Sequence, residues 1–416
     1  MLFKLLLVFC FYLPFQLALN PSAGIDLASG RIFILLLLFI WLAESLKKKR
    51  INIGNTKTNF FIICFLAINL LSFSVAKDID WSLRKFLFLL SVFPLYFVFS
   101  DSLDTKNRKE RVAKALVLGG GIISIIAIFQ FIAQFIFGLD VTYSFWSKNI
   151  VPFFLGKSVT TAVLKNPSWL VNISGKTYLR SIAMFPDPHM LAFFLGMIAP
   201  FSFGLYLKNK RKLYLIIFLI MLFSDFLTFS RGGYLGLSLG AGIFFLTTWD
   251  KIKKRYQLTI SILFLIGILT LFIPSPVSDR FFSSFNLKEG SNQGRMETWG
   301  KAIAIIQNYP FLGVGIGNYP LAINPKANYR DPIYAHSIYF DIAAETGLIN
   351  LFVWISLIAT LIFDFAKKAQ KDTFFFCAMI SIVIFSGHAL VETPLYSPII
   401  LPLFLIIASF DNEKNN

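Results

Sequence analysis

The chain has 416 residues, of which 56% are apolar and 17% aromatic, and Phe alone occurs 49 times. Only 15% of the residues are charged, against roughly a quarter in soluble domains. A water-soluble protein of this length could not bury so much apolar surface, and disordered, collagen-like or coiled-coil chains need a more polar or repetitive sequence. The composition therefore predicts an integral membrane protein.

The net charge of +17 could indicate a nucleic-acid-binding protein. Most of the Lys and Arg residues, however, lie in short connectors between apolar segments, as expected of a membrane protein, so we predict no nucleic-acid partner. The cysteines Cys10, Cys64 and Cys377 lie inside apolar segments and are too few and too scattered for a disulfide framework or a zinc site.

Twelve apolar segments are long enough to cross about 30 Å of hydrocarbon as helices. The first resembles a signal peptide, but residues 17–21 lack a small-x-small cleavage site, so we predict a retained helix. We therefore predict an all-α integral membrane protein with about twelve transmembrane helices. The segments cover about residues 2–19, 31–46, 60–76, 85–100, 112–137, 182–207, 213–229, 233–249, 257–273, 347–366, 373–391 and 396–410.

Positive charges alternate between the connectors of these helices. Five even-numbered connectors hold 21 Lys and Arg residues, whereas three of the short odd-numbered connectors, 20–30, 230–232 and 392–395, hold only Arg231. Because cationic loops resist translocation, we predict that the even-numbered connectors and both termini face the cytoplasm. The odd-numbered connectors then face outward.

Two of the outward-facing connectors are long, too polar to cross a membrane and too aromatic to be simple linkers. Long ordered loops in compact proteins usually carry function, although a passive cap over the helices is the alternative. The predicted organisation is helices 1–5 (1–137), a periplasmic loop (138–181), helices 6–9 (182–273), a large, partly helical periplasmic loop carrying the active site (274–346), and helices 10–12 with a cytoplasmic tail (347–416).

An arginine and two glycines follow Ser230 in the connector between the seventh and eighth segments. Ser230 can cap the next helix, and the glycines allow a ligand to approach the backbone. A helix N-terminus beside a fixed guanidinium suits a phosphate group, so residues 230–233 are a candidate anion site. The alternative is a snorkelling Arg231 on a tight turn.

Residues 294–308 have the pattern of an amphipathic helix, on which Arg295 and Trp299 are four residues apart and share a face. The two side chains could contact a ligand, or they could form a structural cation–π pair. The glycine-rich run 313–317 resembles nucleotide-binding loops but has no preceding strand, so we predict no nucleotide cofactor.

Among the three histidines, His336 is the best candidate for a general base, because it lies in an outer loop near the arginine motifs and imidazole titrates near neutral pH. We expect its ring to stay neutral, since a helix N-terminus and nearby arginines disfavour imidazolium. His189 and His388 lie near outer helix ends, where a structural hydrogen bond is the commoner role. The Asp78-x-Asp80 pair could bind a metal ion, but such pairs are frequent by chance, and we predict no metal site.

Four stretches occur in order along the chain: 180–192, 230–233, 295–299 with 310–317, and 335–337 with 345–347. They resemble the four motifs of the O-antigen ligase and polymerase superfamily of bacterial inner-membrane glycosyltransferases. Those motifs are Arg-x-x-(Gly)-x-Phe-x-x-Pro-Asn-x-x-Ala, Ser-Arg-Gly-Gly, Arg-x-x-x-Trp leading to Pro-x-x-Gly-x-Gly, and Ala-His-Asn…Glu-x-Gly. This chain departs from them by having His189 and Ser337 where the family has Asn.

The resemblance implies a GT-C-like enzyme of the inner membrane that takes a glycan from undecaprenyl pyrophosphate. Transfer to an acceptor hydroxyl would occur at the periplasmic face, with inversion of the anomeric centre and without metal or other cofactor. The implied site consists of the catalytic base His336, the pyrophosphate ligands Arg180, Arg231 and Arg295, and the acceptor-binding or supporting residues His189, Trp299 and Glu345.

The resemblance leaves the acceptor open. A ligase joins the glycan to the lipid A–core oligosaccharide, a polymerase joins it to a second lipid-linked repeat, and a protein O-oligosaccharyltransferase joins it to a protein hydroxyl. We expect the lipid A–core acceptor, with membrane lipids around the helices. A lipid-linked-oligosaccharide flippase also has twelve helices, but it would carry cations along a lumen within the membrane, where this sequence has few.

Overall fold

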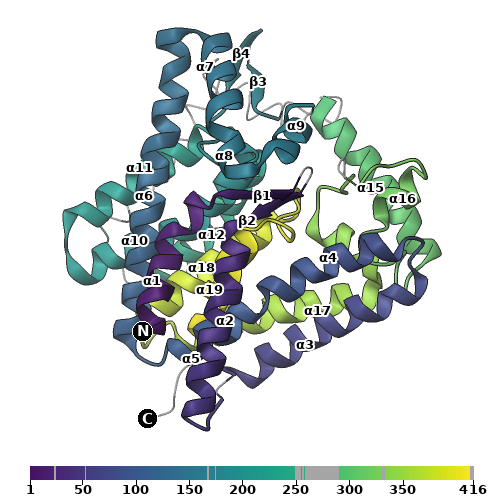
Figure 1. Cartoon of the computed structure of the whole chain (residues 1–416). Coiled ribbons are helices and arrows are strands. Elements are labelled where there is room, and N and C mark those ends of the chain that lie inside the picture. The colour runs from purple at the N-terminus through teal and green to yellow at the C-terminus, as the bar shows by residue number, and fades with distance from the viewer. Residues whose placement is uncertain are drawn as a thin grey trace.

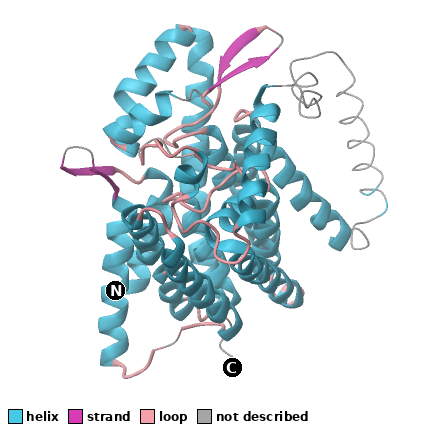
Figure 2. Ribbon diagram, turned by 90° about the vertical axis from the view of Figure 1, so that its right-hand side faces the viewer, coloured by secondary structure: helices cyan, strands magenta, loops and turns pink. Residues whose placement is uncertain are grey.

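The computed structural model describes residues 1–22, 25–51, 53–165, 168–173, 175–248, 254, 257, 290–329 and 333–412. Within these ranges the chain is mainly helical, and its strands form two antiparallel hairpins (Figure 1). Figure 2 shows both hairpins at the edge of the helical bundle. The prediction of an all-α membrane protein is therefore confirmed in its class.

The first part of the chain contains α1 (Leu2–Tyr12), β1 (Ala18–Ser22), β2 (Ile25–Ala28), α2 (Ser29–Lys47), α3 (Thr56–Leu71), α4 (Ile79–Val92), α5 (Pro94–Ser102) and α6 (Lys106–Phe137). The predicted loop 138–181 holds α7 (Leu139–Phe145), a π-helical turn (Trp146–Ile150), α8 (Val151–Leu155), α9 (Lys157–Lys165), β3 (Leu170–Ile173) and β4 (Lys176–Leu179). The remaining helices are α10 (Pro188–Asn209), α11 (Lys212–Phe226), α12 (Arg231–Thr248), α15 (Gly290–Asn308), α16 (Tyr319–Ile323), α17 (Ile338–Lys368), α18 (Thr373–His388) and α19 (Ile400–Ala408).

Helices occupy every predicted membrane segment that the structure describes. Residues 258–273 of the ninth segment lie outside the described residues, as do residues 274–289 of the second long loop. Among the described helices, six stretches are both long and apolar enough to cross a membrane, and the chain is a multi-pass membrane protein. The count of twelve spans and their orientation stay predictions. The predicted first segment is too long at its end, because Pro14 cannot donate the next helical hydrogen bond and residues 18–22 form β1.

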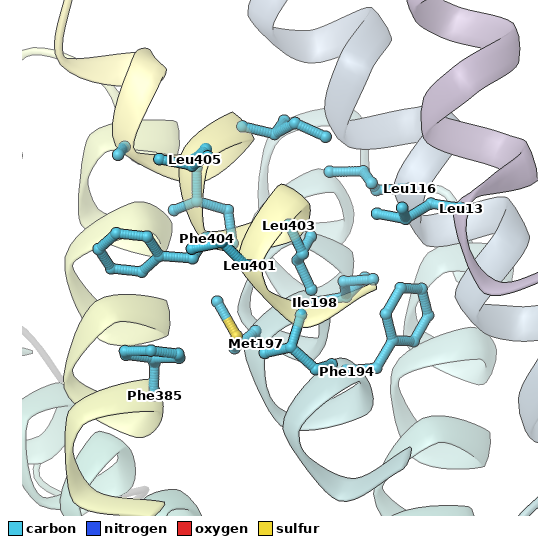
Figure 3. Close-up of a cluster of buried hydrophobic side chains, with 14 of the residues drawn as sticks. Leu13, Leu116, Phe194, Met197, Ile198, Phe385, Leu401, Leu403, Phe404 and Leu405 are labelled. Atoms are coloured by element: carbon cyan, nitrogen blue, oxygen red, sulfur yellow. The ribbon is translucent and has the colours of Figure 1, made fainter. Parts of the chain in front are cut away.

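The core of the bundle is built around α10 and α19, both of which are buried on nearly all sides. Figure 3 shows Leu401, Leu403 and Phe404 of α19 packed beside Met197 and Ile198 of α10. A helix that is apolar on every face must be buried, and α19 is buried within the protein. The central pair therefore provides the fixed frame from which the outer loops extend.

Helices α12 and α18 pack closely along a stripe of glycines. A β-carbon added at Gly236 would lie 2.6 Å from the backbone oxygen of Ile384, and one added at Gly232 would lie 2.4 Å from the ring of His388. Small residues at helix contacts in membranes allow such close backbone approach. The stripe fixes the start of α12 against the end of α18.

Gly347 divides α17 into a short outer part and a longer membrane part. Its φ of +85° and ψ of +169° break the helix, and the segment after Pro310 packs against the break, where Leu348 donates its N–H to the oxygen of Pro310. A β-carbon on Gly347 would overlap the carbonyl of Phe311. The outer part of α17 is therefore held by the loop that follows α15.

Replacing Gly236 by Ala should lower the free energy of unfolding by ~1–3 kcal/mol, because α12 must move away from the Ile384 carbonyl. Gly242→Ala, on the same helix but with open space around the added β-carbon, is the matched control and should be neutral or slightly stabilising. The thermal unfolding midpoint in detergent measures both. Equal midpoints for the two variants would contradict the packing argument.

Candidate functional site

The buried carboxylate of Glu392, in the connector between α18 and α19, is the centre of the site. Its Oε1 lies 2.7 Å from Nη2 of Arg295 and 3.5 Å from Nε2 of His189. Its Oε2 lies 3.4 Å from Nδ1 of His336. One acidic side chain thus contacts three of the residues that the sequence motifs singled out.

The three partners come from segments that are far apart in sequence. Arg295 lies on α15, His189 lies in the first turn of α10, and His336 immediately precedes Ser337, the N-cap of α17. A buried carboxylate needs charge and hydrogen-bond partners, because an isolated one is strongly destabilising. The contacts with Glu392 therefore stabilise the arrangement in which these three segments meet at one point.

Ser230 connects this cluster to the start of α12. Its Oγ accepts the N–H of Gly233 at 3.1 Å, which confirms the predicted helix cap. The same oxygen lies 2.8 Å from Nδ1 of His189 and 3.3 Å from Nε2 of His388. The anion-site turn and the Glu392 cluster thus share His189.

The hydrogen bonds of this network assign the histidine tautomers. A neutral His189 that accepts the Ser230 hydroxyl at Nδ1 carries its proton on Nε2, which lies 3.5 Å from the Glu392 carboxylate. His388 then donates its Nε2–H to Ser230 Oγ. The ring of His388 is fully buried and stacks on Phe193 with centroids 3.6 Å apart, which agrees with the structural role predicted for it.

Arg180 is buried behind the Ser230 turn and donates to three backbone carbonyls. The acceptors are Thr228 at 2.7 Å, Ser168 at 2.8 Å and Phe229 at 3.3 Å. These bonds fix the turn that presents Ser230 and the start of α12. The predicted role of Arg180 as a pyrophosphate ligand stays a prediction, and the structure gives it a positioning role.

The backbone around the network includes unusual conformations. Ala183, Phe229 and His336 have φ values of +49°, +49° and +52°, a region that non-glycine residues seldom occupy. Each of them adjoins the network: Ala183 follows Arg180 by three residues, Phe229 precedes Ser230, and His336 contacts Glu392. Such conformations persist where surrounding contacts enforce them, and they concentrate at functional sites.

The electrostatic prediction for His336 is wrong in sign. The hydrogen bond to Glu392 raises the pKa of His336 above its ordinary value and outweighs burial, which lowers it. Burial opposes ionisation of Glu392, but His189, His336 and Arg295 together hold the pKa of its carboxyl well below the usual range. The sequence argument considered the helix N-terminus and the arginines but did not include this carboxylate.

Asp341, in the first turn of α17, connects the loop of His336 to the connector of Glu392. Its Oδ1 accepts the N–H of Ala335 at 2.8 Å, and its other oxygen accepts the hydroxyl of Thr393. These partners immediately neighbour His336 and Glu392 in sequence. Asp341 thereby sets the distance between the base candidate and its carboxylate.

The remaining predicted residues lie in other contacts. Glu345 pairs with Lys85 at 2.6 Å and accepts the hydroxyl of Tyr396 at 3.3 Å. Trp299 packs against Phe340, with ring centroids 5.7 Å apart. Supporting roles for Glu345 and Trp299 stay predictions, and the described residues contain no group of three His, Cys, Asp or Glu side chains that could hold a metal ion.

Glu392 and Asp341 were not identified from the sequence. The signal for Glu392 was a carboxylate one turn after His388, next to an apolar helix, where an ionisable residue marks a candidate functional site. Asp341 is a similar case, since it is an acidic residue inside a largely apolar segment. Both lie outside the arginine and histidine motifs, so these motifs do not select them.

Residues 216–355 match the family model for O-antigen ligase, and this stretch contains Ser230, Arg231, Arg295 and His336. The resemblance to the O-antigen ligase superfamily is therefore confirmed over this part of the chain. It is also 28% identical, over 232 residues, to the ComP-specific O-oligosaccharyltransferase of Acinetobacter baylyi, an alignment that covers 51% of this chain and 41% of that protein. Both findings are similarities of part of the chain to O-antigen ligase-like proteins.

Shorter similarities connect the chain to lipoprotein signal peptidases. It is 36% identical over 101 residues to the one from Borreliella afzelii and 38% identical over 107 residues to the one from Borrelia turicatae. These alignments cover 23% and 24% of this chain, and 59% and 62% of the relatives. The chain thus spans less than two thirds of each relative described, and less than a quarter of it resembles the peptidases.

The titration of His336 should depend on Glu392. With only three histidines in the chain, ¹⁵N-labelled His gives a simple NMR spectrum. The His336 midpoint should lie above the ordinary value of about 6.5 and should fall in Glu392→Gln, because the carboxylate that stabilises the imidazolium is lost. Glu297→Gln, which changes an exposed carboxylate on α15, is the control. A midpoint unchanged by Glu392→Gln would contradict the assignment.

Proposed function

We propose that the protein is an inverting, metal-independent glycosyltransferase that moves a glycan from undecaprenyl pyrophosphate to an acceptor hydroxyl. The observation that carries the proposal is the single cluster formed by His336, Glu392 and Arg295, joined through His189 to the Ser230–Arg231 turn. It combines a base with groups suited to a phosphate. The reaction would occur at the periplasmic face of the inner membrane, with both termini in the cytoplasm.

His336 serves as the general base. Its Nδ1 donates to Glu392, so Nε2 is the nitrogen that takes the proton of the acceptor hydroxyl. The side chain is about 50% exposed, which gives a substrate access to it. Glu392 stabilises the imidazolium that forms, in the way that a buried carboxylate supports a catalytic histidine in hydrolytic triads.

The acceptor oxygen attacks the anomeric carbon as the bond from that carbon to the pyrophosphate oxygen breaks. The pyrophosphate leaves with the electron pair of this bond, and no general acid is needed if cations meet its charge. Arg231 and Arg295 supply that charge, and the N-terminus of α12 adds a favourable dipole. Arg180 holds the turn that carries Arg231 and is a third candidate ligand.

We propose the lipid A–core oligosaccharide as the acceptor, as in an O-antigen ligase. The relative from Acinetobacter baylyi favours a second candidate, a protein hydroxyl, because that protein is an O-oligosaccharyltransferase specific for ComP. A second lipid-linked repeat, as in a polymerase, uses the same chemistry. A flippase or a peptidase has no need of a base placed beside two phosphate-binding arginines.

His336→Ala should reduce glycan transfer by ~10²–10⁴-fold, the usual contribution of general-base assistance. Arg231→Lys and Arg295→Lys should also impair transfer strongly, because Lys keeps the charge but loses the planar fork that binds phosphate oxygens. Transfer is measured with the protein in lipid nanodiscs, using lipid-linked glycan and lipid A–core from the producing cell.

The control is Arg111→Lys, which changes an exposed arginine near the start of α6. This variant should transfer at the parental rate. Folded His336→Ala protein that transfers at more than a tenth of the normal rate would remove His336 as the base. Normal rates for both arginine variants would remove the pyrophosphate site.

A further inference from the structure

A polar cavity that is separate from the Glu392 cluster lies between the first turn of α4 and the turn at residues 326–329. Its volume is about 470 Å³, within the range of small-molecule sites. The Asp-x-Asp pair of the sequence lies in its wall, and no step of the proposed reaction uses that pair. The principal lining residues are Asp78, Asp80, Trp81, Arg84, Lys326 and Tyr329.

Hydrogen bonds from Asn318 attach the segment before the 326–329 turn to the first turn of α4. Asn318 accepts the N–H of Asp78 at 2.7 Å and donates its side-chain amide to the oxygen of Asp78 at 3.1 Å. Gly317, with a φ of +82°, allows its backbone to approach the oxygen of Trp81. Asp78 in turn caps α4 by accepting the N–H of Trp81. These contacts hold the α4 wall of the cavity in place, and an ordered wall lowers the cost of binding.

Aromatic rings line one side of the cavity. Trp81 and Tyr329 meet edge to face with centroids 5.3 Å apart, and the guanidinium of Arg84 lies 5.0 Å from the Tyr329 ring centre. Tyr329 remains 37% exposed. An aromatic surface beside charged groups offers an apolar face together with donors and acceptors.

The chemistry of the lining selects a class of ligand. Two carboxylates disfavour an anion, and Arg84 with Lys326 disfavours a cation. A ligand with many hydroxyl groups suits the cavity, since carboxylates accept from hydroxyls while Arg and Lys donate to them. The apolar face of a sugar ring packs against aromatic rings such as those of Trp81 and Tyr329.

The α4 wall of the cavity adjoins contacts to residues that are close in sequence to the Glu392 cluster. Lys85, next to Arg84, bonds Glu345 and lies 4.1 Å from the centre of the Tyr396 ring and 5.5 Å from that of Tyr334. Tyr329 and His336 are seven positions apart in sequence, so their Cα atoms are at most about 25 Å apart, a distance that a short oligosaccharide spans.

From this arrangement we infer that the cavity between α4 and residues 326–329 binds a sugar residue of a glycan that the enzyme handles. The inference rests on the proposed function and deepens it, by adding a subsite remote from the bond that is made. The sugar belongs either to the donor glycan or to the acceptor oligosaccharide, which share the same recognition chemistry.

The test is saturation-transfer NMR on the full-length protein in lipid nanodiscs. One arm uses the oligosaccharide released by mild acid from the lipid-linked glycan, and the other uses the core oligosaccharide released from lipopolysaccharide. Signal in the first arm identifies a donor subsite, and signal in the second identifies an acceptor subsite. Asp80→Asn and Tyr329→Ala should each weaken binding about tenfold, the effect expected when one charged hydrogen bond or one packing contact is lost.

The control variant is Tyr309→Ala, which removes a 56% exposed tyrosine outside the cavity and should bind like the parent protein. Failure of the parent protein to bind either oligosaccharide, or parental binding by both cavity variants, would overturn the inference. Binding is read without catalysis, and His336→Ala should retain it. Failure of the proposed reaction and failure of the proposed subsite therefore give different experimental results.

Discussion

The site depends on the burial of one carboxylate. Removing an ionised group from water costs several kcal/mol unless charges and hydrogen bonds replace the solvent. Glu392 meets this requirement only because Arg295, His336 and His189 reach it from three separate segments. The same contacts that make its burial tolerable also place His336, the proposed base, beside the guanidinium group of Arg295, so the proposed chemistry and the stability share one set of interactions.

Rigid helices set the positions from which these loops reach the carboxylate. The glycine stripe of α12 lets Ser230 and Arg231 approach the end of α18, and Arg180 fixes the preceding turn through backbone carbonyls. Asp341 connects the loops of His336 and Glu392. Donors and acceptors on the backbone therefore determine the geometry of the site as much as the motif side chains do.

Hydrophobic segments predicted the positions of the membrane helices that the structure describes, and local motifs selected His189, Arg295 and His336, which meet at Glu392. The roles assigned to these side chains stay predictions. The partner of His336 was not predictable, because spacing along a helix defines shared faces but does not determine which distant loops meet. The raised pKa of His336 follows from that unpredicted contact with Glu392. For the same reason the three carbonyl partners of Arg180 could not be foreseen.

A structure of the protein in lipid nanodiscs with undecaprenyl pyrophosphate, determined by electron cryo-microscopy, would test the central claim most directly. We predict phosphate oxygens within about 3 Å of the guanidinium groups of Arg231 and Arg295, on the side of the cluster where His336 is exposed. A pyrophosphate bound elsewhere, with both guanidinium groups contacting protein alone, would contradict the account.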